Sequence, residues 1–178
     1  MKECLVKDIE LKLISELMKN ARRSDRELAK LLGVSQPTVT RTRTKLEKEG
    51  YIQEYAAIPD FKRLGYELMS LIFVQVKQTL AREELEQARK ITHEGLDKKA
   101  PSEIILFERG MGMGFSGVII SFHKDYTSYT SLVEKTREYP FLEQASTESF
   151  LIDLTDDIHY RALTLRTLAE NILTLKKE

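Results

Sequence analysis

Two helix starts separated by one helix stop lie close together in the first third of the chain. Ser24 can cap a helix, and Glu27 three residues later completes a capping box. Gly33 ends that helix, because glycine readily adopts the left-handed conformation. Ser35 starts a new helix with Pro37 in its first turn, where the missing N–H is not needed. Two helices joined by so short a turn predict a helix-turn-helix.

The segments on either side complete a small helical domain. Apolar residues at helical spacing predict a first helix over residues 6–19. The second helix is expected to bury a stripe of three leucines, Leu28, Leu31 and Leu32. The third helix runs to about residue 48, and the weak alternation of residues 51–58 indicates extended chain.

The third helix has an unusual composition. Val39 and Leu46 fall on one side of it, and the opposite side is rich in Thr, Arg and Lys. Arg and Lys pair with guanine edges or phosphates, and Thr contacts phosphates or thymine methyls. This face favours a helix that enters the major groove of double-stranded DNA, and a solvated helix of a small bundle is the alternative. The predicted DNA-contacting residues are Ser35, Gln36, Pro37, Thr38, Thr40, Arg41, Thr44 and Lys45.

The charges are unevenly distributed. The chain has 28 basic and 28 acidic residues, so its formal net charge is zero. Residues 1–65 hold 14 of the basic and 10 of the acidic residues, and residues 66–178 hold 14 and 18. A basic front and an acidic remainder suggest that the first domain is the one that meets a polyanion.

The rest of the chain predicts an α+β domain. Pro59 and Gly65 mark a linker over residues 59–66. Strands are expected at residues 68–77, 103–109, 117–123 and 144–154, and helices at 82–94 and 125–138. This βαββαβ order is ferredoxin-like, with both helices on one face of a four-stranded antiparallel sheet. The other, apolar face would be covered by a second copy in a homodimer or higher homo-oligomer.

The chain ends in an apolar pattern that predicts a helix of about 20 residues over 157–176. Such a helix would either cover the open face of the chain's own sheet or join subunits. The predicted organisation is therefore a DNA-binding domain at 1–58, the linker, a second domain at 67–155 and a C-terminal helix at 156–178.

Several short motifs then point to one family. They are D-x-x-L-x-x-I from Asp8, E-L-A-K-L-L-G-V-S from Glu27, the Thr38-Val39 pair, and L-E-x-x-G-Y-I from Leu46. Residues 8–60 thereby resemble the winged helix-turn-helix of the Lrp/AsnC transcription regulators. The resemblance implies a regulator that binds double-stranded DNA and is not an enzyme. That family usually has Arg followed by Ile or Val where this chain has Thr42 and Arg43. Arg43 is thus expected on the buried stripe, where it either snorkels or binds the DNA backbone.

A glycine-rich segment, RGMGMGFSG, precedes the third expected strand. A dinucleotide fingerprint would need a helix after it, so that function is excluded. The segment is either a flexible hairpin or, as the family resemblance implies, an effector loop. The effector-binding residues would be Gly112, Gly114, Phe115 and Ser116, with backbone N–H groups holding a small molecule. The family often has an acidic residue at the position of Ser116, so we expect a ligand other than a free amino acid, or none.

Other chemistry has little support in the sequence. The three histidines are far apart and no metal-binding spacing occurs, so neither a metal nor a cofactor is expected. The enzyme alternative is a siroheme decarboxylase of the same architecture, which would need basic and His residues around the substrate carboxylates. A single cysteine, Cys4, favours a reducing cytoplasm. The longest uncharged run, residues 110–123, is too short for a membrane span.

Overall fold

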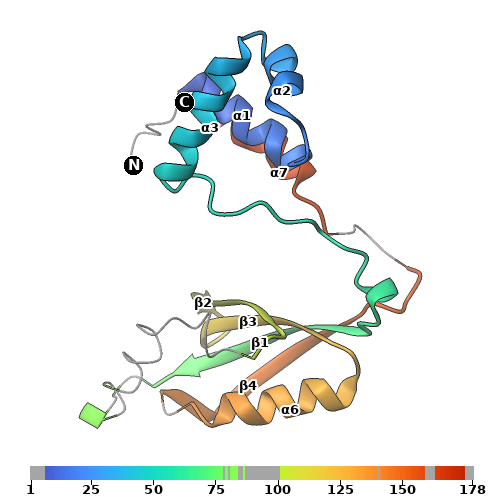
Figure 1. The fold of residues 1–178 in the computed structure, drawn as a ribbon. Helices are drawn as coiled ribbons and strands as arrows, with labels where there is room; N and C mark the ends of the chain where they lie inside the picture. Colours follow the sequence, from blue (N-terminus) through green and yellow to red (C-terminus); the bar gives the residue numbers. More distant parts are fainter. Residues whose placement is uncertain are drawn as a thin grey trace. The chain divides into compact units, whose positions relative to one another are not determined.

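The computed structural model describes residues 7–77, 79, 81–83, 86, 101–139, 141–158 and 163–174. The chain forms two compact units (Figure 1). The helical unit comprises Met1–Ile58 with Tyr160–Glu178, and the sheet unit comprises Pro59–His159. None of the described helices combines the length and hydrophobicity needed to span a membrane.

The helical unit begins with the three predicted helices, α1 (Asp8–Lys19), α2 (Asp25–Leu32) and α3 (Gln36–Lys48). The predicted capping box of Ser24 and Glu27 is confirmed, because each side chain binds the other residue's backbone N–H. Gly33 ends α2 with a φ of 67°, in the left-handed region. Residues 51–60 follow α3 without forming a β-strand.

The core between these helices contains six buried residues. They are Leu13, Leu17, Leu28, Ala29, Val39 and Leu46. One prediction for α2 is wrong, because Leu31 is 57% exposed. The buried stripe consists of Leu28, Ala29 and the partly buried Leu32. At 100° per residue, Leu31 lies roughly 100° around the helix from the centre of that stripe.

The sheet unit has four antiparallel strands in the order β2-β3-β1-β4. Their bounds are β1 Leu68–Val76, β2 Ile104–Gly112, β3 Phe115–His123 and β4 Leu142–Asp153. Helix α6 (Tyr126–Arg137), capped by Asp125 as predicted, packs on one face through Leu132 (Figure 1). The predicted α+β, ferredoxin-like fold is confirmed, although most of the expected helix 82–94 lies outside the described residues.

The opposite face of the sheet is mostly apolar. Strand register places Leu71 beside Ile120 and Phe150, and Phe73 between Val118 and the exposed Glu148. Phe150 is 62% exposed. Phe61, next to the short helix η1 (Lys62–Leu64), stacks on Phe122 at one end of this face, with ring centroids 3.9 Å apart. Large apolar side chains therefore reach the surface of the sheet.

The C-terminal segment differs from its prediction in length and place. The described helix is α7 (Arg166–Asn171), followed by the short helix η2 (Ile172–Thr174). Ile158 and residues 163–165 are not helical, so a continuous helix over 157–176 is wrong. Helix α7 packs on α1 within the helical unit. Ala169 is fully buried there, and its carbonyl accepts a hydrogen bond from Ser15 Oγ at 2.6 Å.

Candidate nucleic-acid interface

Helix α3 is presented on the surface by its two buried anchors. Val39 and Leu46 are at most 1% exposed, which fixes the opposite side of the helix toward solvent. At its start, Ser35 Oγ accepts a hydrogen bond from the Thr38 N–H at 3.4 Å, and Pro37 occupies the first turn. The eight side chains predicted to contact DNA are all exposed. The helix therefore carries a polar face on a rigid apolar base.

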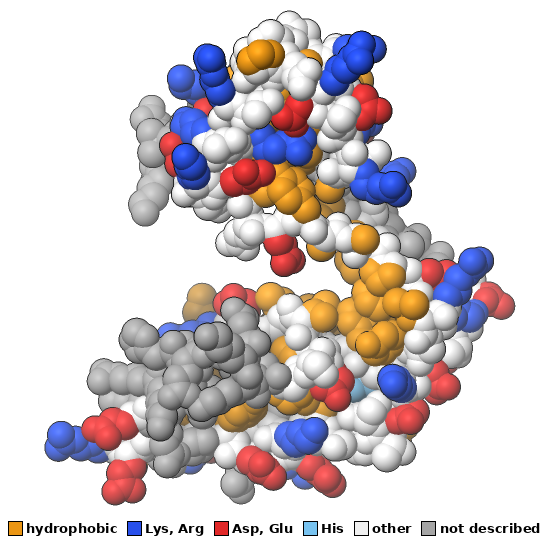
Figure 2. Space-filling model, in the orientation of Figure 1, with side chains coloured by type: hydrophobic (Ala, Val, Ile, Leu, Met, Phe, Trp, Pro, Cys, Tyr) orange, Lys and Arg blue, Asp and Glu red, His pale blue; other side chains and the backbone are white. Residues whose placement is uncertain are grey.

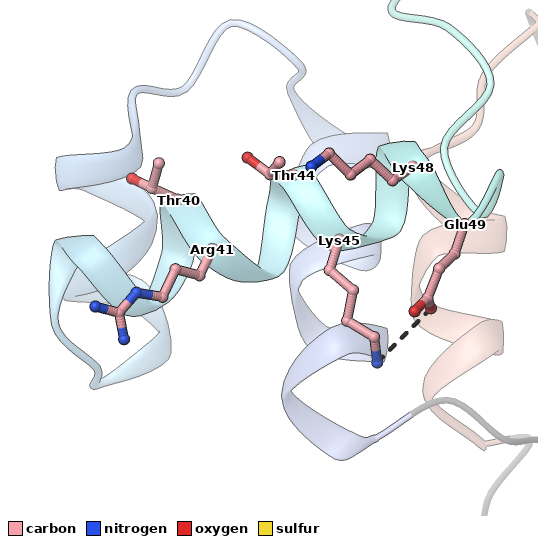
Figure 3. A pocket seen from close by; sticks show the side chains of 6 residues that line it. All are labelled: Thr40, Arg41, Thr44, Lys45, Lys48 and Glu49. Atoms are coloured by element: carbon pink, nitrogen blue, oxygen red, sulfur yellow. Dashed lines mark ion pairs between the residues drawn. The ribbon is translucent and has the colours of Figure 1, made fainter.

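A shallow groove runs along this face. Its lining residues are Thr40, Arg41, Thr44, Lys45, Lys48 and Glu49 (Figure 3). Arg41 points away from the helix and Lys48 lies along it toward Thr44; both are exposed, and no hydrogen bond or ion pair joins either side chain to the rest of the described chain. Both are thus free to meet an anion. Figure 2 shows further Lys and Arg side chains on the visible face of the helical unit.

Lys45 differs from these two free cations. Its Nζ lies 2.7 Å from Glu10 Oε1 on α1, and 3.7 Å from Glu49 Oε2. The hydrogen bond with Glu10 raises the pKa of Lys45 and lowers the pKa of Glu10. The sequence did not reveal this pair, because the two residues are 35 positions apart.

Thr40 and Arg43 share an anchor on α2. Asp25 Oδ2 accepts a hydrogen bond from Thr40 Oγ1 at 2.6 Å, and Asp25 Oδ1 lies 2.8 Å from Arg43 Nη2. The guanidinium of Arg43 also lies over the ring of Tyr55 at 5.9 Å. Tyr55 in turn donates a hydrogen bond to Glu47 at 2.7 Å. Arg43 is therefore half-buried and holds α3 to α2.

Burial and the hydrogen bond to Glu47 raise the pKa of Tyr55 to about 12. The phenol consequently remains a hydrogen-bond donor at neutral pH. This contact ties the extended segment after α3 to the helix itself.

The predicted effector loop is a tight hairpin between β2 and β3. Its two turn residues, Met113 and Gly114, have φ values of 51° and 81°. Positive φ at both positions is typical of the type I′ turn, which matches the twist of paired strands. Strand β2 extends to Gly112 and β3 begins at Phe115, so the predicted loop over residues 110–116 is largely strand. Ser116 Oγ accepts a hydrogen bond from the Val76 N–H at 2.7 Å.

The buried histidine of the sheet unit is not part of either site. His123 is fully buried, with Nε2 at 3.0 Å from both Ser70 Oγ and Ser121 Oγ. Its Nδ1 has no hydrogen-bond partner. The other two histidines lie outside the described residues. Nothing in the described part of the chain supports the siroheme alternative.

Comparison with known proteins agrees with this geometry. Residues 7–53 match the family described as winged helix-turn-helix DNA-binding. An uncharacterized HTH-type transcriptional regulator of Pyrococcus furiosus is 33% identical over 104 residues, covering 58% of this chain and 64% of that protein. The Leucine-responsive regulatory protein of Rhizobium meliloti is 36% identical over 69 residues, or 39% of this chain and 44% of that one. The chain thus spans less than two thirds of the length of these relatives.

Solved structures extend the likeness to both units. The structure of Bacillus subtilis LrpC has a TM-score of 0.63 at 24% identity, covering 90% of this chain and all of that one. A Neisseria meningitidis transcriptional regulator, solved in complex with L-Met, has a TM-score of 0.67 at 18% identity and covers 92% and 99%. Over the helix-turn-helix the chain is therefore similar in sequence to winged helix-turn-helix DNA-binding domains, and over both units it shares the fold of LrpC and the Neisseria regulator.

Proposed function

We propose that this chain is a sequence-specific, DNA-binding transcription regulator of the cytoplasm. The observation that carries the proposal is the exposed face of α3, where Arg41 has no partner among the described residues. A guanidinium so placed can pair with the O6 and N7 atoms of guanine. The exposed helix start at Ser35–Thr38 offers hydroxyl groups to the neighbouring phosphates.

Arg41→Ala tests this assignment. We expect it to weaken binding to a duplex selected from random DNA by about 1–3 kcal/mol, with relaxed specificity at one base pair. Arg63→Ala removes the same charge from an arginine of the sheet unit that is 86% exposed and should leave affinity nearly unchanged. Equal losses in the two variants would contradict a role for α3. Failure of the unmodified protein to bind any duplex more tightly than about 10⁻⁴ M at low salt would refute the function itself.

We infer further that the protein acts as a homodimer or higher homo-oligomer. The support is the sheet face around Leu71, Phe73 and Phe150, where large apolar side chains reach the surface. Exposed apolar patches of this kind mark interfaces with other proteins. Two-fold pairing would then place two α3 helices on half-sites about one helical turn apart, roughly 34 Å, or a multiple of that spacing. Phe150→Glu should convert the assembly to monomers in light scattering. A monomeric unmodified protein at micromolar concentration would contradict the inference.

We propose, in addition, that a small molecule binds the sheet unit and changes the affinity of the protein for DNA. Its site would comprise Gly112, Gly114, Phe115 and Ser116 at the hairpin, and the L-Met complex of the Neisseria regulator supports a ligand in this fold. Gly114→Asn is a suitable test, because Asn tolerates the positive φ of the turn while adding a side chain. We expect it to abolish any ligand-induced change in DNA affinity, with at most a small fall in melting temperature from the strain at this φ of 81°. The panel should include amino acids and other small carboxylates, and no response from the unmodified protein would refute the effector.

A further inference from the structure

One cation of the groove on α3, Lys45, is already paired with a carboxylate of α1, that of Glu10. The carboxylate of Glu10 is only 6% exposed, whereas Lys45 is 44% exposed. Glu10 also accepts a hydrogen bond from the Lys7 N–H at 2.7 Å, as part of the box that caps α1. The cap holds the carboxylate in place, and Lys45 reaches back to it from α3 (Figure 3 shows its course).

Removing Lys45 from this pair would leave a nearly buried carboxylate without its counter-charge. Separating the two residues gives up a charge-assisted hydrogen bond to a carboxylate that water reaches poorly. A DNA phosphate must therefore compete with Glu10 for Lys45. Arg41 and Lys48, which line the same groove, face no such competitor in the described residues.

We propose that Glu10 limits the affinity of the protein for the DNA backbone, because it withholds Lys45 from phosphate contacts. This inference rests on the proposed function as a DNA-binding protein. Phosphate contacts add affinity but carry no sequence information. With Lys45 withheld, the sequence-independent part of the affinity, and with it the salt dependence of binding, stays lower than the number of cations in the groove would give.

Glu10→Gln is the direct test. The Gln side-chain oxygen can still accept the hydrogen bond from the Lys7 N–H, so the cap is retained while the charge is lost. Lys45 is then free to bind one more phosphate. We expect the plot of log affinity against log salt to steepen by about 0.9, which corresponds to roughly 3–4-fold more affinity lost between 50 and 200 mM salt. Binding to a random-sequence duplex and to the selected duplex should both tighten at low salt, with their ratio nearly unchanged.

Two further variants separate release of Lys45 from a general change in charge. Glu49→Gln removes one acidic charge from the same groove but leaves the pair with Glu10 intact, so its salt slope should equal that of the unmodified protein. Glu10→Gln combined with Lys45→Met should return the slope to the unmodified value. An unchanged slope in Glu10→Gln, or a steeper slope that persists without Lys45, would overturn the inference.

Lys45→Met alone provides an independent check that does not depend on the Glu10 variant. If Glu10 withholds Lys45, this substitution leaves the salt slope unchanged. A slope shallower by about 0.9 would show that Lys45 already contacts phosphate and would overturn the inference. Absence of DNA binding by the unmodified protein is a different result, because it would refute the proposed function.

Discussion

Ser15→Ala should loosen the helical unit at the contact between α1 and α7. Ser15 is 1% exposed and its hydroxyl donates to the carbonyl of Ala169, which is fully buried. Removing the donor deletes this buried hydrogen bond, which costs about 1–2 kcal/mol. The population of the open form should rise roughly 5–30-fold. Hydrogen exchange of the backbone amides in α1 and α7 measures this rise directly.

Thr167→Ala is the matched control, because it removes an exposed hydroxyl from α7 itself. Surface substitutions of this kind change stability by no more than about 0.5 kcal/mol. Equal amide protection in the two variants would refute the reasoning that α7 is an integral part of the helical unit. Faster exchange in α7 alone, with α1 unchanged, would also contradict it.

Two further predictions concern the sheet unit. Burial lowers the pKa of His123 below 6.5. The unfolded chain therefore takes up a proton more readily than the folded one. The free energy of unfolding consequently falls as the pH drops below about 6.5. Urea denaturation between pH 7.5 and 5 should show this loss in the unmodified protein and a flatter profile in His123→Gln. Gly117→Ala should destabilise the sheet by about 1–3 kcal/mol, because its Cβ would lie 3.0 Å from Val74 Cγ2 and 3.2 Å from the Glu108 carbonyl oxygen. Gly110→Ala, which meets nothing within 4 Å, is the control in thermal unfolding, and equal melting temperatures would contradict the packing argument.

Local signals in the sequence predicted most of the fold. The caps at Ser24, Ser35 and Asp125 involve residues three positions apart, and a short pattern reveals such contacts. Val39 and Leu46 lie two turns apart on one face, so helical spacing alone predicted which side of α3 is buried. Both kinds of signal depend on neighbours along the chain.

Contacts between distant segments could not be predicted in this way. The Glu10–Lys45 pair and the Asp25–Arg43 pair depend on how α1, α2 and α3 pack. The contact of Ser15 with Ala169 spans 154 positions, and the apolar pattern of the tail did not indicate its partner. Leu11 lies four residues before Ser15 and therefore on the same face of α1. It is buried, but it does not belong to the core of the three helices.

Sequence reading by α3 is tested most directly by comparing two affinities of the unmodified protein at one physiological salt concentration, one for a selected palindromic duplex and one for a scrambled duplex. We expect the selected duplex to bind at least about 10³-fold more tightly. Equal affinity for the two duplexes would show that α3 does not read the sequence.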